Sequence, residues 1–311
     1  MATGQKKYRL VTRSDFDGIA CAALLKELDM VGEIKFVHPR DMQEGKVEIT
    51  DSDITANLPY VEGVHLAFDH HLSETERVAK KKNHIINTDA MSTAFVIYNH
   101  YGGKAKFPRI SDELMDAVDR GDSARFTESN ILRPKGWVLL HFLMDPRTGL
   151  GRFRNFRISN YDLMMQLVDL CRDHTAEQIL QTPDVAERRQ LYFEHEGKFK
   201  EQIQRCARVE GDTVVIDLRN EDPIWAGNRF MIYALYPECT VSVHVMWGLQ
   251  KQNTAFAVGK SIINRLSQCN IGSLMLEYGG GGQEAVGTCQ VENERADQVL
   301  KEILQKIAAA G

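Results

Sequence analysis

The sequence predicts two α/β domains joined by a helical segment. Three observations support this prediction. In the first half, short apolar runs alternate with helix-like segments; residues 161–208 carry a nearly continuous helical pattern; and β-branched runs return after Gly211. Strands separated by helices or long crossovers favour a parallel sheet with both faces covered. With 311 residues, of which 43% are hydrophobic and 26% charged, the chain is long enough for two separate cores.

The first half predicts a strand, a loop and a helix, followed by further strands. Short apolar or β-branched runs predict strands at residues 8–12, 34–38, 46–50 and 64–68. Residues 19–32 have helical spacing and end at Gly32, and residues 91–103 predict a helix with a Ser or Thr cap and a glycine stop. In parallel sheets ligands bind outside the carboxyl ends of the strands.

The second half predicts a helical connector and then a smaller α/β domain with a mixed sheet. Strand-like runs lie at residues 213–218, 240–247 and 254–259, and residues 295–310 form an amphipathic helical pattern. We therefore expect a first domain at residues 1–185, a helical connector at 186–210 and a second domain at 211–311.

Charge and cysteine usage narrow the class of protein. The formal net charge of −5 gives no global attraction to duplex DNA or to an anionic membrane, so neither is an expected partner. The six cysteines are scattered without a C-x-x-C pair, which is typical of reduced thiols in a cytosolic protein. No run approaches the roughly 18 apolar residues that a membrane span needs. We expect a cytoplasmic protein.

Acidic and imidazole side chains follow three of the predicted strands at the point where each strand ends. These groups are Asp15 with Asp17, Asp51 with Asp53, and Asp69 with His70 and His71. Each of these groups alone is also typical of a solvated turn, a helix cap or a hydrogen-bonded pair of surface residues. Together along one sheet edge, several carboxylates would repel one another unless cations were present. Asp and His ligands without cysteine favour Mn²⁺, with Mg²⁺ or another divalent ion as the alternative.

The turn after the first strand has further features of a phosphate site. Gly18 allows the backbone to turn tightly into the following helix. The N-terminus of that helix presents free N–H groups and the positive end of the helix dipole, which attract a phosphate.

These motifs resemble the DHH phosphoesterase superfamily, which includes exopolyphosphatases and oligoribonucleotide or cyclic-dinucleotide phosphodiesterases. The resemblance covers nearly the whole chain and implies that the first domain is catalytic and that the second binds the substrate. It rests on five stretches: SDFDG (14–18), DSDITANLPY (51–60), FDHHLSE (68–74), DRGDSARF (119–126) and GGGGQEAVGT (279–288).

The resemblance implies a centre with two ions, most simply Mn²⁺. Asp15 and Asp17 would each hold one ion, and an Asp of the second motif, Asp53 rather than Asp51, would bridge them. His70 and Asp122 would complete the second ion's ligands. His71 would contact the phosphate or orient its neighbours, and Asp69 would support both imidazoles. Asp122 could instead be a helix-stop residue after Gly121.

Two positions depart from the family pattern. Many branches carry a histidine shortly before the first Asp, where this chain has Val11 and Arg13. The first ion would then be held weakly, or Arg13 would handle phosphate instead. The histidine that usually follows the glycines is replaced by Gln283, whose amide can donate a hydrogen bond but cannot take up a further proton or carry a positive charge.

The remaining substrate-side candidates lie in the second domain. Glycine-rich loops permit close backbone approach to an anion, and arginine is suited to bidentate phosphate contact. The candidates are Gly280, Gly281, Gly282, Gln283, Arg229, Asn264 and Arg265. The alternatives are a flexible hairpin connection for the glycines and exposed ion pairs for the arginines.

The function expected from these features is metal-dependent hydrolysis of a phosphodiester or phosphoanhydride in a cleft between the domains. Two ions would activate a water for in-line attack. A nucleotide, a short oligonucleotide, a dinucleotide or polyphosphate is the expected substrate, and a homodimer is a possible assembly. The alternative is a catalytically weakened binding or sensor protein, because Val11, Arg13 and Gln283 stand where catalytic members often have histidine.

Overall fold

The computed structural model describes residues 6–153 and 155–311, which form two compact units. The first unit comprises the described residues up to Arg125 together with Pro134–Leu191, and the second comprises Phe126–Arg133 and Tyr192–Gly311. Helix α10 (Pro183–Cys206) runs from one unit into the other, and its C-terminal part packs with the second.

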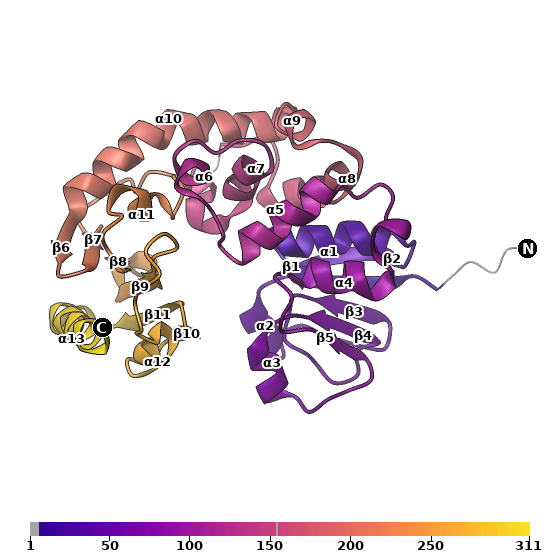
Figure 1. The fold of residues 1–311 in the computed structure, drawn as a ribbon, viewed down its shortest axis with the longest axis horizontal. Helices are drawn as coiled ribbons and strands as arrows, with labels where there is room; N and C mark the ends of the chain where they lie inside the picture. Colours follow the sequence, from indigo (N-terminus) through magenta and orange to yellow (C-terminus); the bar gives the residue numbers. More distant parts are fainter. Residues whose placement is uncertain (1–5, 154) are drawn as a thin grey trace, which may run out of the picture. The chain divides into compact units, whose positions relative to one another are not determined.

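A five-stranded parallel sheet forms the centre of the first unit (Figure 1). Its strands are β1 (Tyr8–Arg13), β2 (Val31–Val37), β3 (Asp53–Ala56), β4 (Leu66–Asp69) and β5 (His84–Ile86). They pair in the order β2-β1-β3-β4-β5, and every pairing is parallel. The predicted parallel sheet is confirmed. The carboxyl ends of β1, β3 and β4 are therefore neighbours along one edge.

Helices cover both faces of this sheet. Helices α1 (Phe16–Glu27) and α4 (Thr93–Tyr101) pack on each other and on β1 and β4. A separate apolar cluster joins Val11 of β1 to Met42 of α2 (Pro39–Gln43) and to Leu58. The remaining helices of this unit are α3 (Leu72–Arg77), α5 (Asp112–Asp122), α7 (Gly136–Met144), α8 (Asn160–Asp173) and α9 (Ala176–Ile179).

Helix α4 forms where the sequence predicts it, with the predicted type of cap at each end. The Ser92 side chain accepts a hydrogen bond from the backbone N–H of Phe95, which satisfies one donor of the first turn. Gly102 ends the helix in the left-handed region, with φ at 104°, where a side chain would be strained.

One predicted strand is wrong: the strand expected at residues 46–50 forms instead at Asp53–Ala56. Residues 46–50 do not form a strand; Val47 and Ile49 instead pack their side chains into the apolar clusters that cover the sheet. Alternating burial in a covering loop has the same period as burial in a strand, so the pattern alone does not distinguish them. The strand is β3, which begins at Asp53 and pairs with β1 from Arg9 to Thr12.

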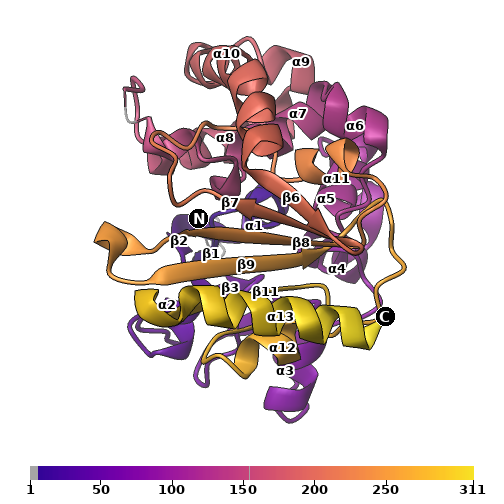
Figure 2. The ribbon, with the colours of Figure 1, turned by 90° about the vertical axis from the view of Figure 1, so that its left-hand side faces the viewer.

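The second unit contains the mixed sheet that the sequence predicts. Its strands are β6 (Ala207–Glu210), β7 (Thr213–Asp217), β8 (Val241–Trp247), β9 (Thr254–Lys260), β10 (Gly281–Gln283) and β11 (Val286–Val291). The order is β10-β11-β9-β8-β7-β6, and only β7 and β8 pair in parallel. Helices α12 (Ile271–Leu276) and α13 (Ala296–Ala310) pack against one face, with Phe256 and Ile303 in the shared core (Figure 2).

The division into units differs from the expected borders at residues 185 and 210. Helix α6 (Glu128–Leu132) contacts α11 (Met231–Leu235), and the rings of Phe126 and Phe230 lie 5.3 Å apart, so this short segment packs with the second unit. The expected connector also does not remain helical to its end, because β6 begins at Ala207. None of the described helices combines the length and the apolar character that a bilayer crossing requires.

Candidate metal centre and phosphate site

The turn from β1 into the first residues of α1 places two carboxylates, Asp15 and Asp17, at the edge of the first sheet. Asp15 caps α1, and its Oδ1 accepts a hydrogen bond from the backbone N–H of Gly18 at 2.9 Å. A Cβ on Gly18 would lie 1.9 Å from the carbonyl oxygen of Arg13. Only glycine therefore allows the chain to turn this closely from β1 into α1, and the predicted need for glycine has a steric cause.

Asp17 is held by the start of another helix. It is 2% exposed, and its oxygens accept hydrogen bonds from the backbone N–H groups of Thr93 and Ala94 at 3.0 and 2.8 Å. These donors are the unsatisfied N–H groups of the first turn of α4. They hold the carboxylate in one orientation at the sheet edge, close to β4.

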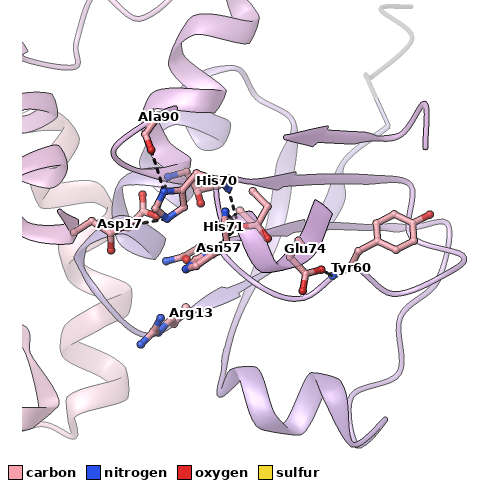
Figure 3. A network of polar contacts seen from close by, with 12 residues as sticks. Arg13, Asp17, Asn57, Tyr60, His70, His71, Glu74 and Ala90 are labelled. Carbon is pink, nitrogen blue, oxygen red and sulfur yellow. Dashed lines mark hydrogen bonds and ion pairs between the residues drawn. The ribbon is translucent and has the colours of Figure 1, made fainter. Parts of the chain in front are cut away.

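His70 and Asp122 complete a group with Asp17. Nδ1 of His70 lies 3.2 Å from the carbonyl oxygen of Ala90 (Figure 3). Nε2 of His70 lies 3.0 Å from Oδ2 of Asp122 without the alignment of a hydrogen bond. If Nδ1 carries the proton and donates it to Ala90, the Nε2 lone pair points toward carboxylate oxygens. That arrangement is repulsive unless a cation lies between them.

This group has the geometry and the chemistry of a cation site. Asp17, His70 and Asp122 each offer one ligand atom, and the three atoms lie within 4.8 Å of one another. Burial, together with the nearby Asp122 carboxylate, raises the pKa of Asp17 to about 7. Burial by itself lowers the pKa of His70, but its contact with Asp122 and the charge of Asp17 outweigh burial and raise the pKa to about 9. Without a metal, protons on His70 and Asp17 offset the clustered negative charge, and a divalent ion would take over that role, so the residues fit one.

The first residue of the Asp-His-His triplet organises the other two. Asp69 is 1% exposed, and its Oδ1 accepts the backbone N–H of His70 at 2.8 Å. The same oxygen lies 2.7 Å from Nδ1 of His71. Although burial lowers the pKa of His71, the hydrogen bond and charge of Asp69 outweigh it, and the pKa is raised. Asp69 thus orients the imidazole of His71 and favours its protonated form.

The structure is similar to that of a pGpG-specific phosphodiesterase from Vibrio cholerae, with 57% sequence identity, a TM-score of 0.86, and coverage of 98% of this chain and 100% of that chain. An exopolyphosphatase-related protein from Bacteroides fragilis has the same fold at 14% identity, with a TM-score of 0.54 and coverage of 97% and 92%.

The chain belongs to the DHH phosphoesterase superfamily. RecJ from Thermus thermophilus, in complex with Mn²⁺, shares the fold at 12% identity and a TM-score of 0.51, covering 98% of this chain and 52% of RecJ. No family model matches the sequence, and no curated protein matches it. The expected fold and the expected class of enzyme, a phosphoesterase, are confirmed.

In this DHH phosphoesterase, Asp53 does not lie at the carboxyl-end edge of the sheet, where the sequence predicts it. It begins β3, so it stands at the amino end of the strand, opposite the edge that carries Asp15 and His70. There it forms an ion pair with Arg9, 2.6 Å away, and accepts the backbone N–H of Thr50. Asp51 lies in the turn before the same strand. The expectation that Asp53 bridges two ions is wrong, because residues 46–50 do not form the strand that would have brought Asp53 to the same edge as Asp15.

Asn57 lies at the carboxyl end of the second-motif strand, where the sequence predicts an aspartate. It follows β3 directly, is 2% exposed, and donates from Nδ2 to Oδ1 of Asp15 at 3.1 Å. Its φ of 56° is a left-handed conformation that asparagine tolerates better than most residues. The signal in the sequence is that Asn57 is the first amide or charged side chain after the buried run ITA.

The last residue of the FDHHLSE motif supports the loop that follows Asn57. Glu74 is buried and accepts the backbone N–H of Tyr60 at 2.9 Å (Figure 3). It also pairs with Arg77. This contact ties the segment after β3 to α3.

The glycines of the second unit have two different roles. A Cβ on Gly280 would lie 2.0 Å from the carbonyl oxygen of Thr288, and one on Gly282 would lie 2.2 Å from that of Val286. These two glycines therefore allow β10 to approach β11. Gly281 has open space around its Cβ position, and Gln283 is exposed at the end of the edge strand β10.

The other candidates of the second unit contact their own surroundings. The guanidinium of Arg229 lies 4.0 Å from the ring centre of Phe230. Asn264 donates to the carbonyl of Glu238, and Nε of Arg265 donates to the carbonyl of Ile262. Their role in substrate binding stays a prediction.

Proposed function

We propose that this phosphoesterase hydrolyses a short linear dinucleotide, pGpG or a close relative, at its single internal phosphodiester bond. The observation that carries the proposal is the 57% identity, over 98% of the chain, to a pGpG-specific phosphodiesterase. A water oxygen would bond to phosphorus, the bond from phosphorus to the 3′-oxygen would break, and that oxygen would take up a proton. Two molecules of GMP would result.

Asp17, His70 and Asp122 would hold a divalent ion for this reaction. Two carboxylates with one imidazole suit Mn²⁺ well and Mg²⁺ less well, because Mg²⁺ prefers oxygen ligands. When bound, such an ion neutralises phosphate charge and makes water more acidic. Asp122 is the most exposed of the three, with 26% of its side chain accessible, so the group is open to a ligand on that side.

His71 would serve the leaving group or the phosphate. With Nδ1 held by Asp69, the Nε2–H of the imidazolium can donate to a phosphoryl oxygen or give its proton to the departing 3′-oxygen. Arg13 would bind another phosphoryl oxygen. Its Nε pairs with Asp15 at 2.9 Å and its side chain is 39% exposed, so the terminal nitrogens can reach a ligand.

The second unit would recognise the nucleotide. The amide of Gln283 offers both a donor and an acceptor, which matches the mixed donors and acceptors on the edge of guanine. Gly281 leaves room for close approach of a ligand. Arg229, Asn264 and Arg265 are further candidates. A homodimer and a cytoplasmic location also stay predictions.

The test is product analysis with purified protein and Mn²⁺. We expect two GMP per pGpG consumed, loss of turnover with EDTA, and recovery when Mn²⁺ is restored. The panel includes pApA, cyclic di-GMP, tetra-guanylate and polyphosphate. Faster release of phosphate from polyphosphate than of GMP from pGpG would contradict the proposal. Binding of pGpG without turnover at saturating Mn²⁺ would favour the sensor alternative.

A further inference from the structure

Asp15 and Asp17 both accept hydrogen bonds from N–H groups, but only Asp15 is also paired with a cationic side chain. Three N–H donors contact Asp15: the backbone of Gly18 and Nδ2 of Asn57 on Oδ1, at 2.9 and 3.1 Å, and Nε of Arg13 on Oδ2, at 2.9 Å. A metal ligand must present a lone pair, whereas these groups present hydrogens. None of these three groups can therefore join Asp15 as a ligand of a second ion.

Too few other ligands are available for a second ion beside Asp15. Within residues 6–153 and 155–311, the cluster whose ligand atoms converge closely enough contains Asp17, His70 and Asp122 but not Asp15. Arginine stays protonated in proteins and cannot bind a cation. The Oδ1 atom of Asn57 is buried without a hydrogen-bond partner among the described residues, but an amide oxygen brings no negative charge. The residues around Asp15 therefore do not fit a second divalent ion.

The charges balance with one ion. Asp15, Asp17 and Asp122 carry three negative charges when ionised, and one divalent ion together with the Arg13 guanidinium carries three positive charges. Asn57 adds none. A second divalent ion would leave the centre with excess positive charge and would stand next to the guanidinium, which repels it.

We infer that this centre binds a single divalent cation at Asp17, His70 and Asp122, and that the Arg13 guanidinium, held by Asp15, takes the place of a second cation. Arg13 then supplies charge neutralisation to a phosphoryl oxygen through its terminal N–H groups. Asn57 holds Asp15 in position without recruiting a metal. The inference rests on the proposed cation site of the preceding subsection, whereas the identity of the substrate does not affect it.

The experiment counts bound Mn²⁺ in metal-stripped protein by equilibrium dialysis with elemental analysis, and records the Mn²⁺ electron paramagnetic resonance spectrum. The wild type is compared with the double variant Arg13→His/Asn57→Asp, which would provide two additional ligands beside Asp15. Arg40→His/Asn220→Asp is the matched control, since it makes the same changes at two exposed positions. Circular dichroism confirms folding, and Asn57→Asp alone is the fallback if the double variant does not fold.

We expect one Mn²⁺ per wild-type and control chain, with the spectrum of isolated ions, and two per chain in the double variant, with magnetic coupling between them. Two coupled ions in the wild type would overturn the inference. One ion in both the wild type and the double variant would show that Arg13 and Asn57 do not exclude the second. No bound ion in the wild type would overturn the cation site itself, which is a distinguishable result.

Discussion

Asn57, which directly follows β3, donates a hydrogen bond to Asp15, which lies between β1 and α1, over 3.1 Å. The two strands are neighbours, so the contact joins adjacent carboxyl ends of the parallel sheet. An amide at this position gives Asp15 a neutral donor where a carboxylate would add charge. The difference bears directly on how many cations this phosphoesterase can bind.

Asp122→Asn tests the cation site with a minimal change of shape. The amide removes one negative ligand, and we expect Mn²⁺ affinity to fall by about 100-fold and turnover of pGpG to fall with it. Asp116→Asn is the control, because Asp116 lies on the same helix α5 but pairs with Arg120 and is 67% exposed. Isothermal titration calorimetry with Mn²⁺ measures the affinity. Equal affinities in the two variants would exclude Asp122 as a ligand.

Asp69→Asn tests whether Asp69 positions His71. The charge of Asp69 raises the pKa of His71, so its removal lowers that pKa. The protonated form is then lost at lower pH, and we expect the alkaline limb of the kcat profile to move to lower pH, with kcat reduced by about 100-fold. Profiles are measured at saturating Mn²⁺. His71→Ala in the same background should add little further loss, and an additive loss would contradict the coupling.

Asp53→Asn tests whether the ion pair between Asp53 and Arg9 stabilises the fold without contributing to catalysis. We expect unchanged Mn²⁺ affinity and kcat, with a free energy of unfolding lower by about 1–3 kcal/mol because the bonds to Arg9 and Thr50 weaken. Denaturant unfolding at several pH values measures this. Loss of activity in folded protein would show that Asp53 belongs to the centre after all.

The difference in free energy of unfolding between the wild type and Asp53→Asn depends on pH with a defined sign. Burial raises the pKa of Asp53, but Arg9 and Thr50 outweigh it and hold the pKa below its ordinary 3.8. The stabilisation is therefore present above the ordinary pKa of aspartate and is lost as the pH falls through the lowered one. We expect wild type and Asp53→Asn to converge in stability as the pH falls through that lowered pKa.

Gly18→Ala tests the tight turn between β1 and α1. The added methyl would overlap the carbonyl oxygen of Arg13, so the loop must shift, which we expect to cost about 1–3 kcal/mol and to impair Mn²⁺ binding by Asp17. Gly197→Ala is the control, because Gly197 lies in helix α10 with open space around it and should gain about 0.5–1 kcal/mol. Thermal unfolding distinguishes them, and equal stabilities would contradict the steric argument.

Much of this protein follows from local sequence patterns. The parallel sheet, helix α4 with both its caps and the mixed second sheet are all predictable, because burial periodicity and capping residues act over a few neighbouring positions. The FDHHLSE motif likewise marks the end of β4, since its apolar run ends directly before the polar side chains. Asp17, His70 and Asp122 are named from the sequence and are brought together in the structure.

Only the tertiary structure decided which end of β3 carries its acidic residues and what surrounds Asp15. The pattern at residues 46–50 indicates which side chains are buried but not whether the segment pairs with a neighbouring strand. A loop that covers the sheet therefore has the same pattern as a strand, and the prediction put Asp53 at the wrong edge of the sheet. The start of a strand is set by pairing with its neighbour, here Arg9 opposite Asp53, and that pairing joins residues 44 positions apart. No local period encodes it, because the contact forms only when distant segments pack together.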